Sequence, residues 1–166
     1  METSRGEEMA ANSPYTPLPG ENSIRLVEIL PASSPEEEIR ITLVNAVIDE
    51  APPYQALSYE WGYPAQESTI RCDGQTMSIT SNLSKLLRSL RRNKKRFSFL
   101  SRDRAHSDLF WIDAISIDQS NTRERNHQVT QMPLIYYRAA QTILVRITGR
   151  VFIHLIHDTV PRDFPE

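Results

Sequence analysis

The stretch from Leu109 to Ile117 constrains the fold more than any other part of this sequence. It is almost continuously apolar, the polar residues Asp118 and Gln119 follow it, and a helical pattern then runs from Glu124 to Leu134. This order predicts a buried strand, a loop and a helix, the unit from which α/β domains are built. In such domains the strand fixes polar groups that the following loop presents. The polar groups placed here are Asp113, Asp118, Gln119 and Glu124.

Other segments supply the remaining strands of a sheet. Four have the composition of strands and end at prolines or polar turns, namely 24–30, 39–47, 54–59 and 142–147. Asp73-Gly74 separates 69–72 from 75–79 and favours a two-residue type I′ turn, whose twist matches paired strands. We therefore predict a β-hairpin in which Ile70 and Cys72 lie across from Met77 and its neighbours.

The first predicted helix follows Thr80 or Ser81, either of which can cap its N-terminus. Its apolar residues recur at spacings of three and four, which indicates one stripe facing a core. The stripe consists of Leu83, Leu86, Leu87 and Leu90. With the strands, it predicts a single α/β domain with a central sheet, flanking helices and a β-hairpin.

The second predicted helix begins after Asn121, which together with Glu124 three residues later resembles a capping box. Pro133 lies inside the helical pattern and is expected to kink or split the helix. The side chains that we expect this helix to bury are Val129, Met132, Tyr136 and either Ala139 or Ala140.

Composition narrows the class of protein. With 166 residues and a net charge of −2, the chain can form one domain with a sizeable core and has no global field that favours nucleic acid or membrane. Cys72 is the single cysteine, so an internal disulfide is excluded, a reducing compartment is favoured, and we expect a small buried side chain. Residues 1–22 are polar and predict a flexible lead-in without a signal peptide. We expect a cytoplasmic protein.

A cluster of basic residues between Arg88 and Arg104 has two interpretations. With Phe97 and Phe99 it resembles a nucleic-acid patch with stacking aromatics. It also fits a solvated helix end, where cations suit the C-terminus. We adopt the second interpretation, because the 21 acidic residues of the chain outweigh its 19 basic ones.

Several separated motifs occur in the order typical of one family. They are Tyr54–Gly62, Ile79–Leu83, Trp111–Gln119, Glu124–Arg125, Gln128–Val129, Met132 and Ile135–Tyr136. In this order they resemble the fungal heterokaryon-incompatibility domain, and Ser23–Pro31 is similar to the lead-in common in that family. The resemblance implies a domain over residues 23–149, with 1–22 as a lead-in and 150–166 as an atypical tail.

The resemblance implies an interaction and signalling module that takes part in non-self recognition between fungal hyphae and can trigger cell death. Protein partners, including a second copy, are expected, with no cofactor and no membrane. The fold is also distantly similar to Toll/interleukin-receptor-like domains. The motif residues expected to form the functional surface are Tyr59, Trp61, Gly62, Trp111, Asp113, Asp118, Gln119, Glu124, Arg125 and Gln128.

The sequence departs from the family pattern at four places. Asp118 stands where the family usually has asparagine, and Pro133 replaces a small residue. Arg146–Gly149 stands where the family strand usually ends in Trp-Leu-Gly, and Arg150–Glu166 is unlike the family. We therefore expect either a truncated domain or a C-terminal end read in the wrong frame.

An enzymatic alternative follows from the more distant similarity. Some Toll/interleukin-receptor-like domains hydrolyse NAD with a glutamate beyond the strand that matches 142–147, where this chain has an unrelated tail. Glu60 and Glu124 remain as catalytic candidates. Beside Trp61, Glu60 is expected to be partly desolvated, with a raised pKa, whereas Glu124 also fits a helix cap. We favour an interaction module over an enzyme.

Two further points concern partners of polar side chains. Asp113 is either a carboxylate satisfied by loop N–H groups, with Arg125 as ion partner, or a functional group. His106 and His127 have no evident partner. We assign no metal site, because His154, His157 and Asp158 have metal-ligand spacing only in a helix, two histidines on such a tail are more often incidental, and a zinc site needs three or four protein ligands.

Overall fold

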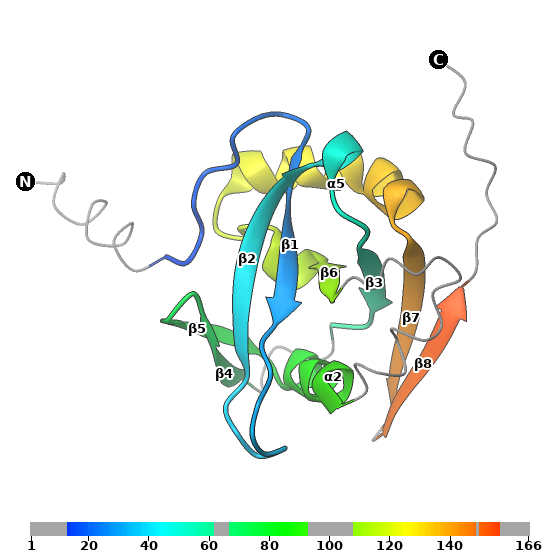
Figure 1. Cartoon of the computed structure of the whole chain (residues 1–166). Helices are drawn as coiled ribbons and strands as arrows, with labels where there is room; N and C mark the ends of the chain where they lie inside the picture. The colour runs from blue at the N-terminus through cyan, green and yellow to red at the C-terminus, as the bar shows by residue number, and fades with distance from the viewer. Residues whose placement is uncertain (1–12, 62–66, 93–107, 149, 157–166) are drawn as a thin grey trace, which may run out of the picture.

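The computed structural model describes residues 13–61, 67–92, 108–148 and 150–156. Its elements are β1 (Ser23–Ile29), β2 (Arg40–Val47), η1 (Ile48–Glu50), β3 (Gln55–Tyr59), β4 (Glu67–Cys72), β5 (Gln75–Thr80), α2 (Ser81–Arg92), β6 (Leu109–Ile112), α4 (Asp113–Ser116), α5 (Thr122–Arg138), β7 (Gln141–Thr148) and β8 (Arg150–Ile156). These strands form one mixed sheet in the order β5-β4-β2-β1-β6-β3-β7-β8 (Figure 1). The predicted α/β class is confirmed.

Parallel strands form the part of the sheet that positions the site. β3 pairs in parallel with β6 on one side and with β7 on the other. β1 runs antiparallel to β6, and its other neighbour is β2, also antiparallel. The carboxyl ends of β3 and β6 therefore meet at one edge, where loops of α/β sheets commonly build sites.

Two apolar clusters lie on opposite faces of the sheet. Consecutive residues of a strand point to opposite faces, and Trp111 belongs to one cluster while its neighbour Ile112 belongs to the other. The leucine stripe of α2 packs into the cluster of Ile112, and Ile135 of α5 packs into the cluster of Trp111. Figure 1 shows the two helices well separated on the sheet. Covered faces explain why β6 is apolar without alternation.

The predicted hairpin is confirmed in detail. Asp73 and Gly74 have φ values of 49° and 80°, as a type I′ turn requires at both central positions. β4 and β5 flank them, with Ile70 opposite Met77 and Cys72 opposite Gln75. The first helix is confirmed as well, because the Leu83 N–H donates to Thr80 Oγ1 at 3.2 Å and the four predicted leucines are buried.

The prediction of one strand from Leu109 to Ile117 is wrong at its second half. β6 ends at Ile112, and the single-turn helix α4 follows. Asp113 Oδ1 accepts from the Ala114 N–H at 2.7 Å, and Ser116 Oγ accepts from the Ile112 N–H at 3.0 Å, so side chains replace ladder partners at this turn. A short apolar run does not distinguish a buried strand from a buried helical turn.

α5 also differs from its prediction. It buries Gln128 and Ile135, with Met132, Tyr136 and Ala139 partly buried, whereas Val129 is 51% exposed and Ala140 is exposed. The helix continues through Pro133, so the chain is not split there. Pro133 is exposed, and the carbonyl that it cannot bond belongs to the exposed Val129, where water can reach it.

Residues 150–156 extend the sheet. They form β8, which pairs antiparallel with β7 from Thr142 opposite Ile156 to Thr148 opposite Arg150. Part of the stretch 150–166 that we expected to be an atypical tail therefore belongs to the sheet. In the described part of the chain, no helix is long and apolar enough to cross a bilayer.

Candidate functional site

The two main motifs meet at the carboxyl edge of β3 and β6. Trp61, which follows β3, donates from Nε1 to Asp113 Oδ2 at 3.0 Å. Asp113 begins α4 directly after β6, and its other oxygen accepts from the Ala114 N–H. Burial raises the pKa of the Asp113 carboxyl, and these two hydrogen bonds lower it in part. The predicted proximity of Trp61 and Asp113 is confirmed.

Gln119 and Arg125 connect to Asp113 in this site through hydrogen bonds to backbone oxygens. Gln119 Nε2 donates to the backbone oxygen of Asp113 at 3.0 Å. Arg125 Nη1 donates to the backbone oxygen of Gln119 at 3.2 Å, so its partner is the loop. Of the partners considered for Asp113, the loop N–H is present at Ala114, whereas the guanidinium of Arg125 bonds the loop backbone and not the carboxylate.

Glu124 forms only half of the predicted capping box. Asn121 Oδ1 accepts from the Glu124 N–H at 3.1 Å and caps α5 as expected. The Glu124 carboxylate accepts instead from the Asp118 N–H at 2.8 Å. Asp118 Oδ1 accepts from the Ser120 hydroxyl at 2.6 Å and from the Ser120 N–H at 3.0 Å. The loop between α4 and α5 is therefore closed by its own polar side chains.

Arg25 is a central residue of the site that the sequence did not reveal. It lies in β1, its side chain is 1% exposed, and it forms a bidentate pair with Glu124, including Nη2 to Oε2 at 3.0 Å. Its guanidinium also donates to the backbone oxygens of Ser116 and Thr16, and it lies 5.1 Å from the ring centre of Tyr15. The sequence feature that could have indicated this role is a single arginine, Arg25, among apolar strand residues. Its partner Glu124 is 99 residues away in the chain, so the sequence does not show the pair.

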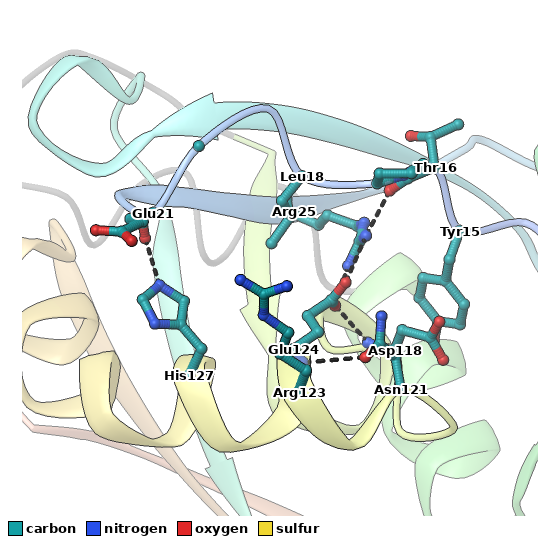
Figure 2. Close-up of a pocket in the computed structure, with 12 residues that line it drawn as sticks. Tyr15, Thr16, Leu18, Glu21, Arg25, Asp118, Asn121, Arg123, Glu124 and His127 are labelled. Atoms are coloured by element: carbon teal, nitrogen blue, oxygen red, sulfur yellow. Dashed lines mark hydrogen bonds and ion pairs between the residues drawn. The ribbon is translucent and has the colours of Figure 1, made fainter.

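A pocket of about 550 Å³ lies beside this ion pair (Figure 2). One wall is the segment 15–21 and the other is the start of α5 with the loop before it. The lining residues are Tyr15, Thr16, Pro17, Leu18, Gly20, Glu21, Arg25, Asp118, Asn121, Arg123, Glu124 and His127. The described part of the N-terminal lead-in thus contributes to the site.

Two side chains of α5 bind the chain at the start of β1 and just before it. Gln128 is buried, and its Nε2 donates to the Ser23 backbone oxygen at 2.9 Å. His127 Nε2 lies 2.6 Å from the Glu21 backbone oxygen. A dashed line marks this contact in Figure 2. His127 therefore has the partner that the sequence did not indicate. The His127 contact ties the segment 15–21 to the helix, and the Gln128 contact ties the start of β1 to it.

The remaining motif residues have mainly packing positions. Trp111 is fully buried, and its ring meets that of Tyr136 edge to face at 5.6 Å. Tyr59 is partly buried, and burial raises the pKa of its hydroxyl. Glu60 is exposed, so the expected desolvation of its carboxylate is wrong. Gly62 and His106 lie outside the described residues.

The basic cluster is described only as far as Arg92. Arg88 and Arg91 donate to the backbone oxygens of Pro35 and Glu37. These two guanidinium groups at the end of α2 therefore bind the loop between β1 and β2, which agrees with the interpretation as a helix end. The basic residues of the cluster from Lys94 to Arg104 lie outside the described ranges.

The described residues contain no group of three potential metal ligands. Residue 154 belongs to a strand, so the helical spacing assumed for His154 and His157 does not apply there. His157 and Asp158 lie outside the described residues.

Comparisons with known proteins agree with the motif order. The family model described as "Heterokaryon incompatibility protein (HET)" matches residues 54–150. "Heterokaryon incompatibility protein 6, OR allele" of Neurospora crassa is 33% identical over 129 residues, which is 73% of this chain. This chain covers 18% of the length of that relative. No solved structure matches.

Proposed function

Because this chain belongs to the fungal heterokaryon incompatibility family, we propose that it is an interaction and signalling module in non-self recognition. In this proposal it acts in the cytoplasm of fused hyphae, and its engagement by a protein partner leads to death of the fused cell. This chain covers 18% of the length of the Neurospora relative. The role in cell death, which would belong to a protein of that full length, is therefore part of our proposal.

The observation that carries the proposal is an exposed tryptophan in a fixed orientation. Trp61 is 43% exposed, yet its indole N–H is bound to Asp113. Tryptophan supplies much of the binding energy at protein interfaces, because a large rigid ring leaves water at a low cost in conformational entropy. Holding the ring before a partner arrives lowers the cost of binding further. The surface formed by Trp61, Gln119 and Arg125 is our proposed partner surface.

The alternative function is that of a Toll/interleukin-receptor-like NAD hydrolase. The positions of the two candidate catalytic glutamates support this alternative less well than they support an interaction module. Both oxygens of Glu124 are engaged with Arg25. Glu60 is exposed, whereas hydrolysis needs a carboxylate held against the ribose in a site that excludes bulk water. The described strand β8, where that similarity would place the catalytic glutamate, contains none. We therefore propose a distant similarity of fold to Toll/interleukin-receptor-like domains, without their NAD-hydrolysing activity.

Expression in a fungal host tests this function. The full chain is expressed in strains that fuse, and death of fused cells is scored by uptake of a vital dye. We expect Trp61→Ala to lower the fraction of dead fusion cells at least severalfold, while Val129→Ala has no effect. Val129 is the matched control, because it is a large apolar residue at 51% exposure outside the proposed surface. Equal killing by Trp61→Ala and the unmodified chain would refute the partner surface.

A further inference from the structure

Strand β5 forms one outer edge of the sheet in the described part of the chain, and its own residues lack the usual protective features of an edge strand. Its sequence, Gln75–Thr80, contains no charged residue and no proline. Natural proteins usually blunt an exposed edge with lysine, proline or a bulge, because free backbone groups there pair with other strands. Figure 1 shows β5 and its neighbour β4 at the margin of the sheet.

The hydrogen-bond parity of the hairpin shows which backbone groups of β5 point outward. Arg71 N–H donates to Ile39 O and Asp73 N–H donates to Ile41 O, so the odd-numbered residues of β4 bond β2. The even-numbered residues Ile70 and Cys72 therefore bond β5, through their partners Met77 and Gln75. The intervening residues of β5 direct their N–H and C=O groups away from β4.

These outward-directed residues are Thr76, Ser78 and Thr80. The side chains of Thr76 and Ser78 are exposed, and within the described ranges no backbone bond is made to the outer side of β5. Thr80 caps α2 with its hydroxyl, so it is the end of the free edge. The edge therefore offers a short row of backbone donors and acceptors centred on Ser78.

We propose that β5 pairs antiparallel with β5 of a second copy of this chain about a two-fold axis at Ser78. The two Ser78 residues exchange both backbone hydrogen bonds, and the Thr80 N–H donates to Thr76 C=O of the other copy. Hydroxyl side chains of β5 then face hydroxyl side chains, a favourable cross-strand pairing. The charged group beside the axis is Glu67 of β4, whose Oε2 accepts from the Ser78 hydroxyl at 3.1 Å. The second copy is the occupant because the row is complementary to itself.

The inner face of the strand supports the same register. Met77 and Ile79 are 8% and 7% exposed, the highest values among the buried apolar residues of the core. With Ser78 on the axis, Met77 of one copy lies opposite Ile79 of the other, and both lose their remaining exposure. A two-fold pairing uses the same edge on each copy, so assembly stops at the dimer.

This dimer goes beyond the proposed function and uses a different surface. β4, β2, β1 and β6 lie between β5 and the strand β3 that precedes Trp61. The killing assay with Trp61→Ala and the assembly assay below can therefore fail independently.

Sedimentation equilibrium of the purified full chain tests the dimer. We expect a concentration-dependent monomer–dimer equilibrium in the unmodified chain. Ser78→Lys should raise the dimer dissociation constant by about fivefold or more, because two like charges then oppose each other across an antiparallel pair. Thr69→Lys is the control, since Thr69 is exposed on the same face opposite Ser78 but lies on the inner strand β4. A monomer at all concentrations, a filament, or a dimer insensitive to Ser78→Lys would overturn the proposal.

Disulfide trapping tests the register and does not depend on a destabilised variant. Residues of a hydrogen-bonded antiparallel pair have Cα atoms about 5.5 Å apart, within the range of a disulfide. Ser78→Cys should therefore give a covalent dimer under mild oxidation, whereas Thr76→Cys should not, because its counterpart lies about 13 Å away along the strand. Native Cys72 is buried and serves as an internal background in both variants. Equal crosslinking of the two variants, or none with Ser78→Cys, would contradict the proposed axis.

Discussion

The indole N–H of Trp61 donates to Asp113 Oδ2 at 3.0 Å and joins two motifs that are 52 residues apart in the chain. The contact exists because β3 and β6 are neighbouring parallel strands, so the residues after them emerge at the same edge of the sheet. One bond thus orients an exposed ring and supplies a partner to a half-buried carboxylate.

The Asp113 carboxyl should make stability depend on pH. Burial raises its pKa above 3.8, so the folded state binds this proton more tightly than the unfolded chain does. Its contribution to stability is then complete below about pH 3.8 and is lost as pH rises through the folded-state pKa. We therefore compare the free energy of unfolding of the unmodified chain with that of Asp113→Asn. The difference, unmodified minus variant, should decrease as pH rises from about 3.8 through the folded-state pKa of Asp113. Asparagine retains an oxygen that can accept from Trp61. Urea unfolding of both proteins at several pH values measures the difference, and a constant difference would be inconsistent with a raised pKa.

Glu124→Gln should destabilise the fold strongly. The substitution leaves the Arg25 guanidinium, whose side chain is 1% exposed, without its carboxylate. Breaking a buried pair by removing one partner costs about 3–5 kcal/mol, and the 11% exposure of Glu124 places the expected loss near the lower value. Glu38→Gln is the control, since its pair with Arg71 is exposed and is worth less than about 1 kcal/mol. Urea unfolding gives both values. Similar small losses would show that the Arg25–Glu124 pair does not hold the site together.

Gly74→Ala should weaken the hairpin by about 1 kcal/mol, because alanine at φ +80° enters the left-handed region that L side chains disfavour. A Cβ at residue 74 would meet no atom within 4 Å, so the loss comes from the backbone alone. Gly20→Ala provides the comparison, since its φ is not positive and its Cβ would lie at an ordinary 3.7 Å from Ser23 Oγ. Thermal unfolding should show the loss for residue 74 only. An unchanged midpoint for Gly74→Ala would argue against the type I′ turn.

The sequence predicted the parts of this structure that depend on neighbouring residues. The Asp73-Gly74 turn and the cap at Asn121 are local, and both appear as expected. The meeting of Trp61 and Asp113 agrees with the expectation that both residues belong to one functional surface, and it follows from the parallel pairing of β3 and β6. Arg25 was missed because its role depends on a partner brought close only by the complete fold. α4 was missed because an apolar run carries the same pattern in a buried turn and in a buried strand.

We propose that this chain acts through protein contacts and does not consume NAD. The most direct test measures nicotinamide release from NAD by the purified chain, in parallel with death of fused cells that express it. We predict killing that depends on Trp61, with nicotinamide release no greater than in buffer. Steady nicotinamide release that is abolished by Glu60→Gln, a surface substitution with no expected effect on folding, or by Glu124→Gln in protein shown to be folded, would contradict the account and establish the hydrolase.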